Sequence, residues 1–142
     1  MGLTKSKNFK TALKTADQWF SRYIRLRDAD CTGEAKCVTC EARKHFKEMD
    51  AGHFISRRHM STRFDEKNVH AQCQKCNKYN AGEQFLYSKE VDLLYGKGTK
   101  DRLYKKSQQI KKYTKNDLME IARLYKSNYT EMLKSKNIDI DA

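Results

Sequence analysis

The amino-acid sequence predicts an α+β protein in which a small zinc-bound unit, a short β-hairpin plus a helix, is flanked by N-terminal and C-terminal helices. Two observations predict this class. Two Cys-x-x-Cys pairs bracket a segment without helical period, and apolar residues recur every three or four positions on both sides of it. The 142 residues are the length of one domain. We therefore expect a single domain, 1–142, with an N-terminal helix (1–30), a zinc-bound core (31–82) and a basic helical C-terminal arm (83–142).

The N-terminal segment has the residue spacing of one amphipathic helix. Its apolar positions follow steps of three and four, and we expect them to pack on the zinc-bound core: Phe9, Leu13, Ala16, Phe20 and Ile24. The other face is basic, with Lys10, Lys14, Arg22 and Arg25. This basic face is either a solvated surface or a surface that faces DNA, and the sequence favours neither.

The core is defined by its cysteines. Cys37/Cys40 and Cys73/Cys76 have the spacing of two zinc knuckles, which together complete a closed tetrahedral site. Cys31 is left over as a thiol outside this spacing. Short mixed runs predict two strands, in HFKEM (45–49) and NVHAQC (68–73), and CQKCNKYNAG predicts a helix that begins at the second knuckle and ends early, near Asn80 and Gly82.

Three helices are expected after Gly82. Apolar residues predict one that stops at the glycines of residues 96–98, and Thr99 is the candidate cap of a lysine-rich helix that runs to about residue 112. Thr114 and Asp117 have capping-box spacing, and the apolar face that follows predicts a long last helix, with a tail that frays from Ser135.

The charge of the chain indicates a polyanionic partner. It has 30 Lys and Arg against 18 Asp and Glu, a formal net charge of +12, spread along the chain. DNA is the partner that we expect from this excess. The sequence has no apolar run long enough to span a membrane and no secretory signal, so we expect no membrane partner and a cytoplasmic location. In a reducing compartment the cysteines favour metal over disulfides.

The segment between the cysteine pairs contains the candidates for chemistry. Hydrolysis of a phosphodiester needs a base, and His53 is the candidate because imidazole titrates near neutral pH. Gly52 beside it would let a backbone or a phosphate approach closely. Asp50 and Asn77 offer oxygen ligands for Mg²⁺ or Mn²⁺. Each also has a structural explanation: His53 as a strand residue, Asp50 as a turn cap and Asn77 as a helix cap.

These residues, in this order, resemble the zinc-stabilised HNH, or ββα-metal (His-Me finger), nucleases. In those nucleases a first Cys-x-x-Cys precedes a strand that ends in the base histidine, and an asparagine lies five residues before the second Cys-x-x-Cys, which a metal ligand follows. Here those places are held by Cys37/Cys40, His53, Asn68, Cys73/Cys76 and Asn77. Many members have Asp directly before the histidine, where this chain has Gly52, which leaves open whether Asp50 or His70 is a metal ligand.

A narrower resemblance covers most of the chain. The runs FSRYIRLRDAD, CVTC, DAGHF and RFDEKNVHAQCQKCNKYNAG are similar to the phage NinG (Rap) family of recombination endonucleases. The resemblance implies a metal-dependent, structure-selective endonuclease that acts on Holliday junctions and D-loops in phage or prophage recombination, in the cytoplasm of the bacterial host. It also implies His53 as general base, Asp50 and Asn77 as ligands of catalytic magnesium, Asn68 as the residue that fixes the histidine loop, and a zinc without chemical role. The alternative is a zinc-stabilised DNA-binding module without catalysis.

Further basic residues of the core are candidates for phosphate contact. Arg57, Arg58 and Arg63 lie between His53 and the second knuckle, and Lys78 follows Asn77; each is otherwise a solvated surface charge. Symmetric cutting of a junction needs two active sites, so a homodimer through the apolar helix faces is an alternative to packing of those faces within one chain.

Overall fold

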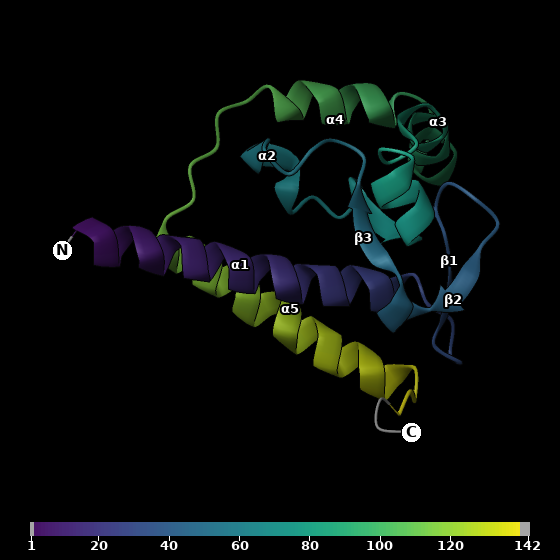
Figure 1. Cartoon of the computed structure of the whole chain (residues 1–142), viewed down its shortest axis with the longest axis horizontal. Helices are drawn as coiled ribbons and strands as arrows, with labels where there is room; N and C mark the ends of the chain where they lie inside the picture. The colour runs from purple at the N-terminus through teal and green to yellow at the C-terminus, as the bar shows by residue number, and fades with distance from the viewer. Residues whose placement is uncertain (1, 140–142) are drawn as a thin grey trace.

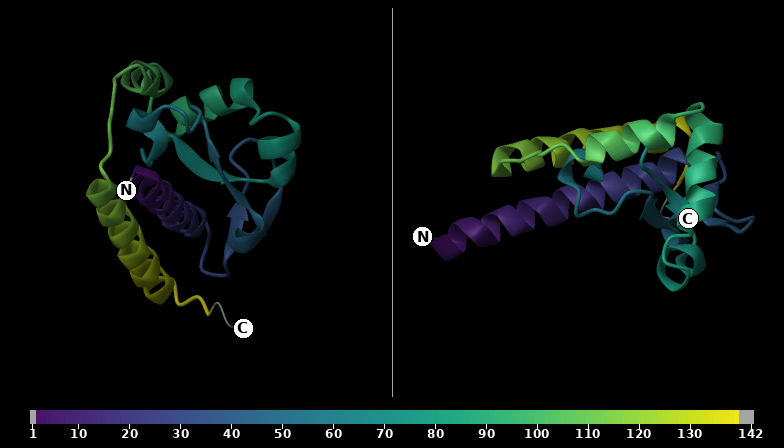
Figure 2. Two further views of the ribbon diagram at one scale, coloured as in Figure 1. Left: turned by 60° about the vertical axis from the view of Figure 1, so that its left-hand side comes forward. Right: turned by 90° about the horizontal axis from the view of Figure 1, so that it is seen from above.

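Two long helices, one from each end of the chain, lie side by side and support a smaller body of strands and short helices (Figure 1). The structure is a computed structural model that describes residues 2–139, with the side chains of 8–139. Helix α1 spans Gly2–Arg27 and α5 spans Lys115–Ser135. The strands lie at the C-terminal part of α1, and an extended segment returns the chain from α4 (Thr99–Ser107) to α5 (Figures 1 and 2). The predicted α+β class is confirmed.

Helix α5 begins where the sequence predicted and packs as its apolar spacing requires. Thr114 Oγ1 accepts a hydrogen bond from the Asp117 amide at 3.0 Å, and Asp117 accepts one from the Thr114 amide, which completes a capping box. The apolar faces of α1 and α5 pack against each other, with Ala16, Phe20 and Leu118 buried. Both faces that we considered for a dimer are therefore used, at least in part, within the chain.

Within residues 2–139, four strands form two antiparallel pairs. Strands β1 (Glu34–Lys36) and β2 (Arg43–His45) pair, with the first cysteine pair in the turn between them. Strands β3 (Asp50–His53) and β4 (Val69–Gln72) pair with Asp50 opposite Gln72 and His53 opposite Val69. The short helix α2 (Met60–Arg63) lies in the connection between β3 and β4, and a five-residue π-helical turn, η2 (Lys75–Tyr79), follows β4.

The prediction of two strands was partly wrong. NVHAQC does contain β4, but in HFKEM only His45 belongs to a strand, and residues Phe46–Glu48 form the 3₁₀ turn η1. Phe46 and Met49 are both buried and stand three residues apart, which suits a helical turn better than a strand. The partner of β4 is instead DAGH, which has weak intrinsic strand preference and is held by pairing.

The helices after Gly82 also differ in detail from the prediction. Helix α3 (Gln84–Tyr95) ends at Gly96 as expected. Helix α4 ends at Ser107 rather than near residue 112, and Ile110 beyond it is 89% exposed, so no apolar contact holds a further turn there. The residue that precedes α4 as its cap is Gly98, while Thr99 Oγ1 donates to the Gly96 carbonyl instead.

The segment after α5 is held in place, although we expected it to fray. The helix ends at Ser135, but the Lys136 ammonium donates to carbonyl oxygens at and just beyond the end of α1, including that of Leu26 at 2.8 Å. A lysine at this place stabilises α1 because it satisfies carbonyls that a helix end leaves open. Ile138 packs against the cluster that contains the cysteines. Residues 140–142 of the expected tail lie outside the described residues. Within residues 2–139, no helix is both long and apolar enough to cross a membrane.

Candidate metal centre and active site

The four paired cysteines form one cluster. Their sulfur atoms all lie within 4.8 Å of one another, and Cys40 Sγ is 3.7 Å from Cys73 Sγ. Four Zn–S bonds of about 2.3 Å in a tetrahedron place sulfurs about 3.8 Å apart, so the cluster has the dimensions of a zinc site. Backbone amides point at the sulfurs, since Cys73 N donates to Cys37 Sγ and Ala42 N to Cys40 Sγ. The cluster can therefore hold a metal such as zinc, and Cys31 is exposed and lies outside it.

His53 is held by a single backbone carbonyl. Its Nε2 lies 3.0 Å from the carbonyl oxygen of Arg63, and because that oxygen can only accept, Nε2 carries the proton and Nδ1 keeps its lone pair. Burial lowers the pKa of His53 to about 4, and the positive charges of Arg57 and Arg63 act in the same direction. The imidazole is therefore neutral at neutral pH and able to accept a proton at Nδ1.

Asn68 ties down the loop that provides this carbonyl. Its side chain is fully buried and makes three hydrogen bonds: Oδ1 accepts from the Ile55 amide at 2.8 Å, and Nδ2 donates to the carbonyls of Ile55 and Thr62 at 3.0 and 3.1 Å. Ile55 and Thr62 lie near the two ends of the connection between β3 and the Arg63 carbonyl. One asparagine side chain thus fixes both ends of the segment that orients His53.

Asp50 and Asn77 lie together. Asn77 Nδ2 donates to Asp50 Oδ2 at 3.0 Å, which joins the first residue of β3 to the turn η2 just beyond Cys76. Among the described residues, no ion pair involves Asp50. A carboxylate and an amide are the oxygen donors that Mg²⁺ and Mn²⁺ prefer, so this pair fits a hard divalent cation.

His53 and Asn77 line the same cavity. It has a volume of about 330 Å³, and its wall also includes Phe54, Ser56 and the turn at Ala81 and Gly82. In that turn Ala81, Gly82 and Glu83 all have positive φ, of 51°, 84° and 51°. The left-handed conformation costs a residue with a side chain about 1–2 kcal/mol. The fold therefore maintains a strained turn in the wall of the cavity, and such strain is typical of functional sites.

Gly52 has a role that the sequence did not predict. We expected it to let a backbone or a phosphate approach, but the buried side chain of Gln72 occupies that space, and a Cβ at Gly52 would lie 2.0 Å from Gln72 Oε1. Gln72 Nε2 donates to Thr39 Oγ1 and to the Gly82 carbonyl, each at 2.9 Å. Gly52 is needed because Gln72 crosses over it to join the first knuckle to the turn beside the cavity.

His70 is engaged by two tyrosines. Tyr87 OH donates to the Gly52 carbonyl at 2.6 Å, so it accepts from His70 Nδ1, and Tyr95 OH lies 2.6 Å from His70 Nε2. Burial lowers the pKa of His70 to about 4. Of the two candidate metal ligands left open by the sequence, Asp50 contacts Asn77, whereas both ring nitrogens of His70 are already bonded.

The basic candidates divide into two kinds. Arg63 is a structural link, because its guanidinium binds both carboxylate oxygens of Asp17, with Nε at 2.9 Å, and donates to the Arg57 carbonyl. Arg57, Arg58 and Lys78 are exposed. Asp17 was not predicted as part of the site, because it lies 46 residues from Arg63 and its only local signal is an acidic residue on a basic helix face. His59 precedes α2, and His45 stacks on Phe46 outside this site.

The structure thus defines an α+β protein in which four clustered cysteines could hold a metal such as zinc, beside a cavity lined by a histidine and an asparagine. The family model described as "Bacteriophage Lambda NinG protein" matches residues 2–135. The chain belongs to the NinG family.

Individual relatives agree with the family model. The chain is 29% identical over 123 residues to "Protein ninG" of Escherichia phage 933W, which covers 86% of this chain and 56% of the relative. It is 30% identical over 92 residues to "Protein ninG" of Escherichia phage lambda, covering 64% and 43%, and 34% identical over 76 residues to that of Salmonella phage P22, covering 53% and 35%. The chain thus spans about half the length of its curated phage relatives, or less. No solved structure matches it.

Proposed function

We propose that this protein is a metal-dependent, structure-selective DNA endonuclease of the HNH type that acts on branched recombination intermediates such as Holliday junctions and D-loops. The observation that carries the proposal is the state of His53: its Nε2 is bound to a fixed carbonyl, its ring is neutral, and it lines a cavity together with Asn77. A base positioned in this way is what hydrolysis of a phosphodiester needs.

His53 would act as the general base. With Nε2 donating to the Arg63 carbonyl, Nδ1 is the atom that takes a proton from the attacking water. That carbonyl also stabilises the imidazolium that forms, because a hydrogen bond to an acceptor is stronger from a charged donor. Asn68 and the Asp17–Arg63 ion pair would be positioning residues, since they hold the segment to which His53 is bonded.

Asp50 and Asn77 would hold the catalytic Mg²⁺ or Mn²⁺. When bound, such an ion supplies positive charge to the scissile phosphate and the departing 3′ oxygen, and the products would carry 5′-phosphate and 3′-hydroxyl ends. Asn77 follows Cys76 directly, so the cysteine cluster would fix the position of one ligand without taking part in the chemistry. The order β3, β4, η2 supports the proposal, because two strands followed by a helical turn are the elements expected of a ββα-metal site.

The choice of substrate rests on charge and on the family. The formal net charge of +12 favours a polyanion, and the resemblance to NinG recombination endonucleases points to branched DNA. The bacterial host cytoplasm would be the place of action.

A cleavage assay on four-way junction, D-loop and linear duplex DNA, with Mg²⁺ or Mn²⁺, tests this function. We expect the wild-type protein to nick branched DNA and His53→Ala to lose activity by about 10²–10⁴-fold, which is the usual contribution of a general base. Zinc content and junction binding should stay unchanged. His59→Ala, at a histidine outside the cavity, is the matched control.

Two results would contradict the proposal. If the wild-type protein with either cation nicks none of the substrates, it is not this endonuclease, and junction binding without nicking would instead identify a zinc-stabilised DNA-binding module. If His53→Ala cleaves as fast as His59→Ala, the base is a different residue.

A further inference from the structure

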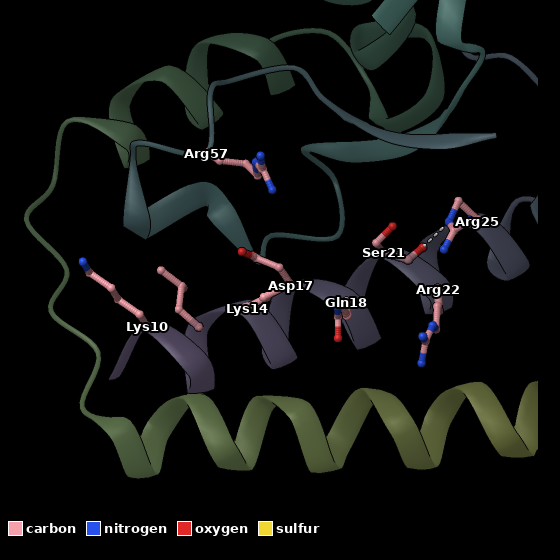
Figure 3. A pocket seen from close by; sticks show the side chains of 9 residues that line it. Lys10, Lys14, Asp17, Gln18, Ser21, Arg22, Arg25 and Arg57 are labelled. Carbon is pink, nitrogen blue, oxygen red and sulfur yellow. Dashed lines mark hydrogen bonds between the residues drawn. The ribbon is translucent and has the colours of Figure 1, made fainter. Parts of the chain in front are cut away.

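A basic groove runs along the face of α1 that lies opposite the loop between β3 and α2 (Figure 3). Its volume is about 530 Å³, and five cations line it: Lys10, Lys14, Arg22, Arg25 and Arg57. Four of these come from α1, and Arg57 reaches toward the helix from the loop across the groove (Figure 3). Two basic pairs of α1, Lys10 with Lys14 and Arg22 with Arg25, therefore line the same cavity as Arg57.

The acidic residue in this groove does not cancel its charge. Asp17 lines the groove, but both of its carboxylate oxygens accept from Arg63, which does not line it. Arg25, at the C-terminal end of the groove, is held in place by two hydrogen bonds: Nη1 donates to the Met49 carbonyl at 3.3 Å, and Nε donates to the Ser21 carbonyl at 3.2 Å. Such anchoring reduces the entropy that a side chain loses when it binds a ligand.

The groove adjoins the candidate active site at two points. Ser56 lines the cavity of His53, and the next residue, Arg57, lines the groove. Arg25 bonds to the carbonyl of Met49, the residue directly before Asp50. A chain of phosphates in the groove would thus pass near the start of β3 at Asp50 and beside the loop that follows His53.

We propose that this groove binds the phosphodiester backbone of DNA and leads it to the His53 cavity. The inference rests on the proposed function for its ligand and deepens it by naming the surface that holds the substrate. From Lys10 to Arg25, α1 extends about 22 Å at about 1.5 Å per residue. One strand of B-DNA has a phosphate about every 3.4 Å of helix axis, so the groove spans about six nucleotides.

The size of the effect follows from counterion release. Each phosphate contact contributes about 0.9 to the slope of log K against log salt concentration for duplex DNA and about 0.7 for single strands. Between 1 M and 0.1 M salt, one phosphate contact therefore raises the binding constant by about 5- to 8-fold, and two contacts raise it by about 25- to 60-fold. Loss of these contacts should weaken binding near 0.1 M salt by the same factors.

The test compares two double variants that remove equal charge. Lys10→Gln with Lys14→Gln changes exposed groove residues, and Lys44→Gln with Lys134→Gln changes exposed lysines on β2 and on the last turn of α5. Fluorescence anisotropy measures binding of a labelled four-way junction and a labelled single strand over a range of salt, in buffer without added divalent cations. Unchanged thermal melting of both variants shows that they fold.

We expect the groove variant to bind about 25- to 60-fold more weakly near 0.1 M salt, with a slope reduced by about 1.4–1.8, and the control to stay within about twofold of wild type. Arg57→Gln should weaken binding by about 5- to 8-fold by the same reasoning. Because no cleavage is measured, the outcome does not depend on whether the protein is a nuclease.

Two outcomes overturn the inference. Equal affinities and slopes for the groove and control variants would show that DNA binds elsewhere. If a polyglutamate peptide binds the wild-type protein more tightly than single-stranded DNA of equal charge and loses this affinity in the groove variant, the groove accepts an acidic protein segment instead.

Discussion

Replacing Asn68 by alanine tests whether the loop between β3 and β4 controls His53. The substitution removes three hydrogen bonds at once and takes the Asn68 partner from both the amide and the carbonyl of Ile55, whereas the Thr62 carbonyl still accepts from the Asp65 amide at 3.2 Å. A buried polar group that loses its partner costs about 1–3 kcal/mol. Because two buried groups of Ile55 lose their partner, we expect Asn68→Ala to lower the free energy of unfolding by at least about 2 kcal/mol.

The same variant should change the titration of His53. Burial is the main reason why the pKa of His53 is lowered to about 4. If the loop opens, water reaches the imidazole and the pKa should rise toward its ordinary value of about 6.5. Histidine resonances followed by NMR between pH 3.5 and 8 measure this pKa, and urea denaturation at pH 7 measures stability.

Asn116→Ala, at an exposed position in the first turn of α5, is the control for the asparagine substitution. Zinc content, measured on the same samples, separates a loop effect from loss of the cysteine cluster. A variant with zinc in place, His53 still titrating near 4 and stability within about 0.5 kcal/mol of wild type would refute this account of the loop.

Three other perturbations have definite expected results. Gly52→Ala should lower the free energy of unfolding by about 1–3 kcal/mol, because the new methyl group overpacks against Gln72, and by less when Gln72 is also replaced by alanine. Urea denaturation measures both values, and an equal loss of stability with and without Gln72 would show that this contact is not the cause. The folded-state pKa of His70, about 4, lies below its unfolded value of about 6.5, so the unfolded chain binds more protons in that window and stability falls on acidification. Between pH 7 and pH 5 wild type should lose about 2 kcal/mol more than His70→Asn, and an equal loss would contradict the burial argument. Chelation of metal, or Cys76→Ser, should abolish cooperative unfolding monitored by circular dichroism, because the cysteine cluster joins both strand pairs; an unchanged transition would show that the fold does not need metal.

Local spacing was enough to predict the parts of the molecule whose partners are near in sequence. The capping box at Thr114 and Asp117 is such a case, since both bonds join residues three apart. The end of α3 at Gly96 is another. Where intrinsic preference and tertiary contacts disagreed, the prediction was wrong. DAGH forms β3 because it pairs with β4, and α4 stops at Ser107 because residues 108–112 are all exposed.

The candidate site shows the same division. The order of the cysteines, His53, Asn68 and Asn77 was visible in the sequence, as was the resemblance to NinG. The contact of Asp50 with Asn77, across 27 residues, and that of Asp17 with Arg63, across 46, were not, because side-chain partners at such separation depend on how α1 and η2 pack on the strands.

The sequence by itself determined the two long helices α1 and α5, the cysteine cluster that could hold zinc, and the family. These features could be predicted because the residues that form each pattern, the repeating apolar positions and the paired cysteines, are close together in the sequence. Only the tertiary structure decided that Gln72 fills the space over Gly52 and that two tyrosines are hydrogen-bonded to the ring nitrogens of His70. It also decided that the basic face of α1 is one wall of a groove near the His53 cavity. Each of these depends on the directions of side chains from separate elements, which packing sets and which no local pattern records.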